Sequence, residues 1–334
     1  MGLTHFPHGI QAAPVVGAGL IDIFSGGNIL FVDGDTGNDG NTGSSPDSAT
    51  ATIGRAIALA SAGAVIYVKA RKVSAGGTDP VSYAETVTIP ATKPGLKLMG
   101  VPSGVAQGAQ PQIKKGSGAV AHITVQAPGC LIANLTINMA GSTAAGVLLD
   151  DDGSTKTAFG TVIQDCVFKG NANKSTLGGA VAWAATGGAW QVQIKGCHFV
   201  DCCTGINALG TSQAAPKDIV IEDCLFYAFA NTDVDADIDF NIGSGATSVV
   251  IRNCVFGTVD VPAKAGGATA RYLDLTKVTN SALVDCSFAC IGQGTDAKTF
   301  GAAGTGALIP ATVRMSGNYG EVGATATSGE IPRT

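Results

Sequence analysis

Hydrophobic and polar side chains alternate over short stretches in the middle of this chain, in a pattern that predicts β-strands. Five seven-residue stretches are nearly identical: VIQDCVF (162–168), QIKGCHF (193–199), VIEDCLF (220–226), VIRNCVF (250–256) and ALVDCSF (282–288). In each stretch a short alternating strand is followed by Asp, Gly or Asn and then by Cys-x-Phe. Because alternation places neighbouring side chains on opposite faces of a strand, one face of every copy is predicted to be buried.

The copies recur at a nearly constant spacing. Their cysteines, Cys166, Cys197, Cys224, Cys254 and Cys286, follow one another at steps of 31, 27, 30 and 32 residues. A degenerate copy lies one step earlier, with Leu135 and Ile137 in place of Cys and Phe. A repeat of this length built from strands predicts a β-solenoid, of about seven to nine coils here. Buried Cys and Phe and solvated polar residues are the expected arrangement in each coil.

The beginning of the chain predicts a different set of elements. A strand starts near Ile29, a turn-rich stretch follows, and an apolar stripe then predicts a short helix over about 52–62. Thr50 or Thr52 can cap the start of this helix, and Gly63 can end it.

This opening resembles that of the pectate-lyase-like right-handed parallel β-helix proteins. The resemblance rests on the strand, the Asp-Gly-Asn loop, the ATIGRAIALA helix, the AVIYV strand, TVTI and PGLKLMG, and it covers roughly residues 29–290. It implies an all-β fold, a right-handed single-stranded parallel β-helix with a short N-terminal capping α-helix. The cap covers the strand edges and the apolar core of the first coil. The first ten residues, MGLTHFPHGI, resemble a group of phage and prophage structural proteins that accompany capsid proteins.

Three segments follow from these patterns. Residues 1–28 form an N-terminal arm that the phage resemblance assigns to virion attachment. Residues 29–290 form the capped parallel β-helix, and residues 291–334 form an exit segment with a Gly-rich tail.

Composition and charge exclude several classes of protein. Only 13% of the residues are charged, the net charge is −5, and the 20 Lys and Arg residues are scattered. A nucleic-acid partner is not expected, because such proteins cluster basic residues. No run of about 18 apolar residues predicts a membrane span. The N-terminus lacks the basic start of a signal peptide, so we expect synthesis in a host cytoplasm.

The repeated cysteines have two interpretations. A column of stacked thiols can bind metal or carry out redox chemistry, or it can be a column of small buried side chains. The chain has no pair of CxxC motifs and no CxxC with HxxxH, so the second interpretation is favoured. Cys202 and Cys203 are likewise expected in a turn or in the core.

Acidic residues form three groups. The loop 33–40 resembles a calcium loop but has Gly37 and Ser44 where ligands are needed, which favours a structural loop. Asp150, Asp151 and Asp152 indicate an exposed turn. The alternating Asp233, Asp235, Asp237 and Asp239 indicate either the solvent face of a coil or a Ca²⁺ or Mg²⁺ site, and the sequence leaves both open.

We find no catalytic arrangement in the sequence. Arg252 has no acidic cluster next to it in the chain, and equivalent repeat positions hold Lys195 and Glu222, which indicates a solvated position. The histidines (His5, His8, His122, His198) form no triad with Ser and Asp. Trp183 and Trp190 are the only tryptophans, which argues against a sugar-stacking cleft. We therefore assign no catalytic, cofactor-binding or metal-binding residue and expect no enzyme.

Together these observations predict a phage virion structural protein on the capsid exterior. It would be a decoration, cement or head-spike protein that docks on the major capsid protein, and its small neutral faces favour a homotrimer. Two alternatives stay open: a tailspike-like polysaccharide depolymerase or lyase, and a non-catalytic adhesin that binds a host-surface glycan or receptor.

Overall fold

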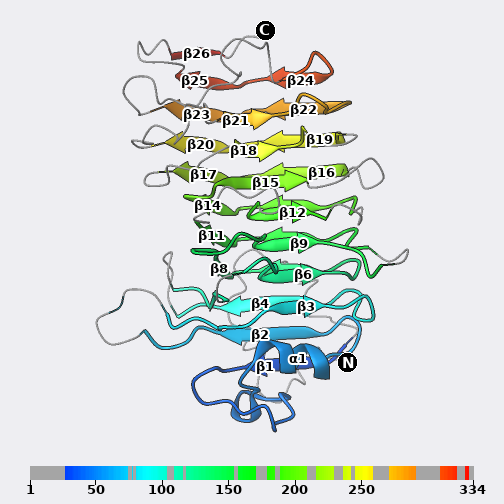
Figure 1. Cartoon of the computed structure of the whole chain (residues 1–334), viewed down its shortest axis with the longest axis vertical. Coiled ribbons are helices and arrows are strands. Elements are labelled where there is room, and N and C mark those ends of the chain that lie inside the picture. The colour runs from blue at the N-terminus through cyan, green and yellow to red at the C-terminus, as the bar shows by residue number, and fades with distance from the viewer. Residues whose placement is uncertain are drawn as a thin grey trace, which may run out of the picture.

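The chain winds into a β-solenoid, shown as a computed structural model in Figure 1. The structure describes residues 27–73, 77, 80–103, 109–115, 118–153, 157–170, 179–184, 189–208, 216–228, 236–241, 245–258, 271–290, 309–321 and 328–330. The described strands form three sheets, and the chain passes from one sheet to the next within each coil. Neighbouring strands come from successive coils and pair in parallel, except for β25 and β26. The predicted all-β parallel β-helix is confirmed.

Each sheet runs along the length of the solenoid. The ten-stranded sheet contains β1 (Ile29–Val32), β2 (Val65–Lys69), β4 (Lys97–Val101), β7 (Leu131–Ala133), β10 (Val162–Gln164), β13 (Gln193–Lys195), β16 (Lys217–Glu222), β19 (Thr247–Arg252), β22 (Ser281–Val284) and β24 (Val313–Ser316). The nine-stranded sheet contains β5 (Gln112–Ile113), β8 (Thr136–Asn138), β11 (Val167–Lys169), β14 (His198–Val200), β17 (Leu225–Ala228), β20 (Val255–Thr258), β23 (Ser287–Cys290), β25 (Tyr319–Glu321) and β26 (Ser328–Glu330). The seven-stranded sheet contains β3 (Val87–Ile89), β6 (Ile123–Val125), β9 (Val147–Leu149), β12 (Val181–Trp183), β15 (Thr204–Ala208), β18 (Ala236–Asp239) and β21 (Arg271–Asp274).

Six coils contribute a strand to all three sheets, from β4–β5–β6 to β19–β20–β21. This is fewer than the seven to nine coils expected, because the first and last coils contribute described strands to only one or two of the parallel sheets. The solenoid also extends past residue 290, since β24 pairs with β22 and β25 pairs with β23 in parallel register. Among the described residues no helix is both long and apolar enough to cross a membrane.

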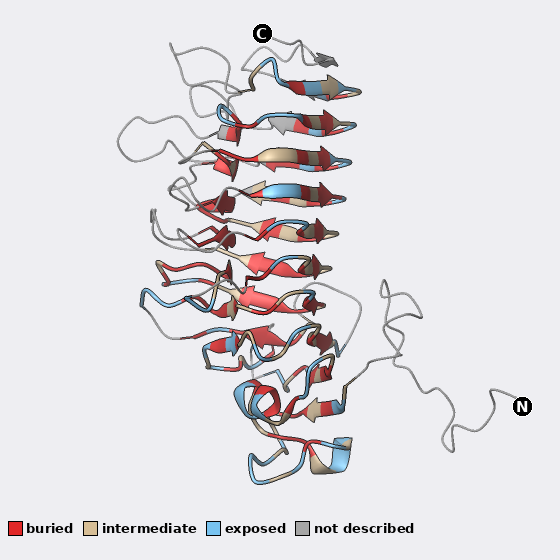
Figure 2. Ribbon diagram, turned by 90° about the vertical axis from the view of Figure 1, so that its right-hand side faces the viewer, coloured by how far each residue is buried: buried red, intermediate tan, exposed pale blue. Residues whose placement is uncertain are grey.

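The repeated stretch forms the core, as its alternation predicts. The Phe of each copy stacks on the Phe of the next coil, with ring centroids 5.0, 4.5, 4.8 and 4.6 Å apart from Phe168 to Phe288. Parallel rings at one-coil spacing maximise apolar contact, so this column stabilises the stacking of the coils. Figure 2 shows buried residues on the strands of every described coil, and exposed residues around the N-terminal cap and the turns.

The cysteine column is also confirmed as core. All five repeated cysteines are free and buried, as are Cys202 and Cys203. The Sγ of Cys197 donates a hydrogen bond to the carbonyl of Ile163 in the preceding coil, at 3.6 Å. Burial raises the pKa of the Cys197 thiol, which keeps it protonated. The described residues hold no group of three His, Cys, Asp or Glu side chains that could bind a metal ion.

The polar residue before each Cys has a defined backbone role. Seven residues at this bend have φ between 51° and 65°: Asn134, Asp165, Gly196, Asp223, Asn253, Asp285 and Gly317. Gly, Asn and Asp are the residues that best tolerate this left-handed conformation. The alternation of Asp, Gly and Asn in the repeat therefore reflects the bend between the ten-stranded and nine-stranded sheets.

A short helix closes the N-terminal end. It is α1 (Ile53–Leu59), preceded by a 3₁₀ turn at Pro46–Ser48, and it is shorter than the predicted 52–62. The Thr52 side chain caps the helix by accepting the N–H of Arg55. Both carboxylate oxygens of Glu85 accept helix N–H groups, from Ile53 and Gly54. The helix buries its apolar face against the first strands, as the predicted cap requires.

Candidate functional site

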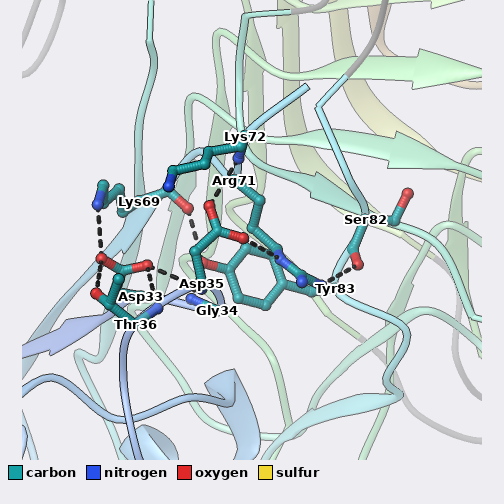
Figure 3. Close-up of polar contacts among 9 residues, drawn as sticks. All are labelled: Asp33, Gly34, Asp35, Thr36, Lys69, Arg71, Lys72, Ser82 and Tyr83. Carbon is teal, nitrogen blue, oxygen red and sulfur yellow. Dashed lines mark hydrogen bonds and ion pairs between the residues drawn. The ribbon is translucent and has the colours of Figure 1, made fainter. Parts of the chain in front are cut away.

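The first coils carry a group of polar residues that we call the anchor cluster: Asp33, Asp35, Lys69, Arg71 and Tyr83 (Figure 3). Asp33 follows β1 and Lys69 ends β2, so stacking of two coils brings them together. Asp33 Oδ2 lies 2.6 Å from Lys69 Nζ, and Asp33 Oδ1 accepts the backbone N–H groups of Asp35 and Thr36. The Asp33 carboxylate therefore joins its own coil to the next one through Lys69 and orders its own loop through the two backbone hydrogen bonds.

Tyr83 lies at the centre of the anchor cluster and is buried. Its Oη accepts the N–H of Gly34 at 3.0 Å and donates to the carbonyl of Lys69 at 2.7 Å. The Arg71 guanidinium lies over the Tyr83 ring, 5.8 Å from its centroid, and its Nε donates to Asp35 Oδ1 at 3.1 Å. Figure 3 shows how these side chains converge between the loop and the strands. The hydroxyl of Tyr83 and the guanidinium of Arg71 are thus bonded to other groups of the protein.

The ionisation of the anchor cluster is fixed at neutral pH. Burial by itself raises the pKa of Asp33, but hydrogen bonds from Lys69, Asp35 and Thr36 outweigh it and lower the pKa to about 2. Burial raises the pKa of Tyr83 to about 12. Asp33 stays charged and Tyr83 stays protonated, so neither group can exchange a proton with a substrate near neutral pH. We interpret the anchor cluster as structural.

The rest of the loop supports the same interpretation. Asp39 Oδ1 accepts the N–H groups of Ala51 and Thr52, and Asn38 Oδ1 accepts the N–H of Gly40. These bonds confirm the prediction of a structural loop whose side chains satisfy the backbone. Asp and Asn act here as turn residues and as partners of N–H groups.

A second group of charges lies on the outer face of the ten-stranded sheet. Strand pairing places Lys195, Glu222 and Arg252 in register on three successive coils, and we call them the charge ladder. Glu222 Oε1 lies 2.8 Å from Lys195 Nζ. Glu222 Oε2 accepts from the Arg252 guanidinium, with 2.7 Å to Nε and a second contact to Nη2. One carboxylate thus bridges two cations.

The charge ladder is accessible, unlike the anchor cluster. The Arg252 side chain is 51% exposed and that of Lys195 35%, whereas Glu222 beneath them is 10% exposed. The hydrogen bond from Lys195 lowers the pKa of Glu222, burial opposes this, and Arg252 lowers it further. Glu222 is therefore ionised at neutral pH, and the ladder carries one surplus positive charge on a surface open to a ligand.

This arrangement corrects the interpretation of Arg252 as a solvated position with no acidic cluster next to it in the chain, because one carboxylate, that of Glu222, contacts it. Glu222 lies 30 residues earlier in the chain, and only the stacking of coils brings it within hydrogen-bond distance. The three different residue types at one repeat position are not three independent solvated side chains. They form one ion-paired group, because residues one repeat apart in the sequence lie next to each other on neighbouring coils.

Of the four alternating aspartates, the structure describes Asp237 and Asp239. Asp233 and Asp235 lie outside the described residues. Asp237 is buried and Asp239 is half-buried, while Ile238 and Phe240 lie in the core as expected.

The turn at Asp150–Asp152 is only partly exposed: Asp150 and Asp151 are half-buried, and their carboxylates accept the N–H groups of Asp151 and Gly153. These carboxylates help to shape the turn.

The structure describes two of the four histidines. His5 and His8 lie outside the described residues. His122 is fully buried and its Nδ1 lies 3.3 Å from the carbonyl of Ala145. His198 is half-buried on the nine-stranded sheet, and burial lowers the pKa of both rings. The described histidines form no triad with Ser and Asp.

The two tryptophans differ in burial, and the exposed one was not identified from the sequence as a candidate surface residue. Trp183 is buried and donates its Nε1–H to the carbonyl of Ala189. Trp190 is exposed and stacks on Phe159 of the preceding coil. The 31-residue step between Phe159 and Trp190 equals a step of the repeat, a signal that sequence reasoning missed.

Comparison with known proteins finds solved structures that are similar to this one. No protein-family model matches the sequence, and no curated protein does. The structure is similar to pectate lyase Pel9A at 14% identity and a TM-score of 0.49, covering 90% of this chain and 81% of the lyase. It is similar to an alginate lyase from Paenibacillus sp. str. FPU-7 at 13% identity and 0.47, covering 81% and 93%. A GH136 lacto-N-biosidase from Eubacterium ramulus gives 10% identity and 0.41, covering 86% and 66%.

At these identities the likeness concerns the fold. The comparison nevertheless corrects the expectation that the chain is not an enzyme, because the proteins found to resemble it are polysaccharide lyases and a glycoside hydrolase.

Proposed function

We propose that the protein is a tailspike-like depolymerase that cleaves an acidic polysaccharide by elimination, with the charge ladder as its site. The observation that supports this proposal is a single ionised carboxylate, Glu222, held between Lys195 and Arg252 on an accessible face. The likeness to polysaccharide lyases suggests the reaction class to test, and the charge ladder suggests the place.

Elimination fits the ladder better than hydrolysis does. Hydrolysis of a glycosidic bond uses two carboxyl groups, one of them a general acid with a raised pKa. The ladder has one carboxyl group, and the Lys195 hydrogen bond lowers its pKa. Elimination instead needs a cation that neutralises the substrate carboxylate, so that the proton on the adjacent carbon becomes more acidic.

Roles for the three side chains follow. Arg252 and Lys195 bind the carboxylate of a uronate residue, and Glu222 positions them through its two ion pairs. Water accepts the proton from the carbon next to the carboxylate, and the electron pair of that C–H bond forms the carbon–carbon double bond. The bond between the neighbouring carbon and the glycosidic oxygen breaks, and that oxygen takes up a proton from water.

The biological setting is a proposal drawn from the opening residues. The likeness of MGLTHFPHGI to phage structural proteins suggests that the protein is carried on a virion, attached through residues 1–28, with host-surface glycan as the substrate. Docking on the major capsid protein and a side-by-side homotrimer are part of the same proposal.

Incubation of the purified full chain with polygalacturonate, alginate and neutral dextran tests this function. We expect ultraviolet absorbance from unsaturated ends with an acidic polymer, and none with dextran. Arg252→Gln and Lys195→Gln should each reduce the rate by about 100-fold. Arg314→Gln is the matched control, because Arg314 is an exposed cation on β24 of the same sheet, separated from the ladder by β22 and outside the register of Lys195, Glu222 and Arg252.

Three results would refute the proposal. They are no cleavage of any acidic polymer, full activity in both ladder variants, and new reducing ends without unsaturated product. The third result would identify a hydrolase.

A further inference from the structure

Two aromatic side chains stack on each other at the surface of the solenoid. The rings of Phe159 and Trp190 are 5.8 Å apart and nearly parallel, with 16° between their planes. Both residues are exposed, Phe159 by 39% and Trp190 by 44%. Every Phe of the repeat is buried, so this aromatic pair is a separate feature and not a continuation of the core.

The backbone holds the aromatic pair at the corner that leads into the ten-stranded sheet. The carbonyl of Phe159 accepts the N–H of Gly129, and the carbonyl of Trp190 accepts the N–H of Gly160, one coil step each. Each aromatic residue is followed by a residue in the left-handed conformation, Gly160 at φ 66° and Gln191 at φ 58°. The corner therefore has a fixed backbone.

The aromatic pair and the charge ladder share a strand. Trp190 comes three residues before β13, and Lys195 ends that strand. Five fully extended residues span about 16 Å, and the left-handed bend at Gln191 makes the separation of Trp190 and Lys195 shorter than this. The pair and the ladder thus lie at opposite ends of the same rung, a separation that a short stretch of polysaccharide can bridge.

A charged pair lies beside the aromatic pair on the next coil. A β-bridge joins Trp190 to Lys217, and Lys217 and Asp218 are both exposed. Their charges cancel, so the surplus positive charge that attracts an acidic ligand comes from the ladder. Lys217 can bind a substrate carboxylate here, and Asp218 repels one.

We propose that Phe159 and Trp190 form a stacking subsite for a sugar ring of an acidic polysaccharide, with Lys217 as its charged contact. This proposal rests on the proposed function and extends it to the way the substrate is held. Phe159 stacks on one face of Trp190 from the preceding coil, and the 44% of Trp190 that remains exposed is the surface open to a ligand. The C–H groups of a pyranose ring pack against the electron-rich face of an aromatic ring.

The size of the patch favours a sugar over a second copy of the chain. A stable protein interface buries roughly 800 Å² on each partner. Two half-exposed rings beside two exposed charged side chains provide far less apolar surface, but they match one or two sugar rings. The spacing of coils, about 4.8 Å, is close to the length of one pyranose unit.

Tryptophan fluorescence and binding to immobilised polygalacturonate test the subsite on the full chain. Trp190 is the exposed one of only two tryptophans, so bound glycan should protect it from acrylamide quenching. Trp190→Ala should weaken binding about tenfold, and Trp190→Phe should retain most of it. Lys217→Gln should weaken and Asp218→Asn should strengthen binding of the acidic polymer.

Tyr319→Ala is the control, because Tyr319 is an exposed aromatic residue on β25 of a different sheet. Wild-type affinity in Trp190→Ala, or an equal loss in Tyr319→Ala, would overturn the subsite. The proposed function fails separately: a chain that never cleaves but loses binding in Trp190→Ala keeps the subsite and refutes the depolymerase.

Discussion

The anchor cluster and the charge ladder are built from the same kinds of side chain, a carboxylate with a lysine and an arginine, yet they differ in what those side chains contact. In the anchor cluster, Asp33 accepts two backbone N–H groups in addition to Lys69. In the ladder, the Glu222 carboxylate bonds to the side chains of Lys195 and Arg252. The first carboxylate is bound to the backbone, and the second is held between two cations whose side chains are 35% and 51% exposed.

This difference teaches how to separate structural from functional charges in a solenoid. A carboxylate that satisfies buried N–H groups cannot leave them without leaving polar groups unpaired. A carboxylate that holds only exposed Lys and Arg can exchange them for a ligand at little cost. Backbone contact, more than residue type, therefore distinguishes the two clusters, and mutation can test this in order of expected effect.

The largest effect is expected for Tyr83→Phe in the anchor cluster. Removal of Oη leaves the N–H of Gly34 and the carbonyl of Lys69 without their partner, which should cost about 3 kcal/mol of unfolding free energy. Urea unfolding followed by circular dichroism measures it. Tyr319→Phe, which removes an exposed hydroxyl, should unfold like the wild type. An unchanged urea midpoint in Tyr83→Phe would show that the anchor cluster is not structural.

A smaller effect, with a defined pH dependence, is expected for Asp33→Asn. The pKa of Asp33 falls from 3.8 to about 2 on folding, so the carboxylate contributes about 2 kcal/mol at neutral pH. This contribution is fully present above about pH 4 and is lost as the pH falls towards 2. The variant should therefore be less stable than the wild type at pH 7, with the difference shrinking in acid.

Asp47→Asn serves as the control for Asp33→Asn, because Asp47 is exposed in the 3₁₀ turn of the same loop region. Its stability should match the wild type at both pH values. A loss in Asp33→Asn that stays constant down to pH 2 would contradict the assigned ionisation.

The core of this fold could be predicted from the sequence because two signals agree on it: the alternation within each strand and the repeat along the chain. Alternation in VIRNCVF places Ile251, Cys254 and Phe256 inside, and the repeat then stacks each on its counterpart. The sequence shows the bend residues as an Asp, Gly or Asn before each Cys, but it does not show their left-handed backbone conformation. The anchor cluster gave no such signal: Gly34 and Tyr83 meet across 49 residues that belong to no repeat.

The charge ladder was present in the sequence but misinterpreted. Aligning the copies on Cys puts Lys195, Glu222 and Arg252 at one position, two residues before each Cys. In a stacked solenoid, residues at the same repeat position are neighbours on successive coils. Lys, Glu and Arg at this position therefore form two ion pairs, one between each pair of neighbouring coils. Different residue types at one repeat position indicate that the position accepts any polar residue only where the side chains of successive repeats do not contact each other.

The smallest effect on stability is expected for Glu222→Gln. The cations that it holds are 35% and 51% exposed, so solvent screens the pairs and the loss should be less than about 1 kcal/mol. Because Lys195 lowers the pKa of Glu222, even this contribution should be present at neutral pH and disappear as the pH falls through the acid range. Urea unfolding at pH 7 and in acid measures both.

Glu85→Gln is the matched comparison, since it changes the same residue type where both carboxylate oxygens accept helix N–H groups. A Gln side chain has one acceptor oxygen, so one N–H at the start of α1 is left unpaired, and the loss should be about 1–2 kcal/mol. Glu85→Gln should thus cost more stability and leave cleavage unchanged, whereas Glu222→Gln should retain stability and reduce cleavage. Equal stability losses in the two variants would mean that backbone contact does not separate structural from functional carboxylates in this molecule.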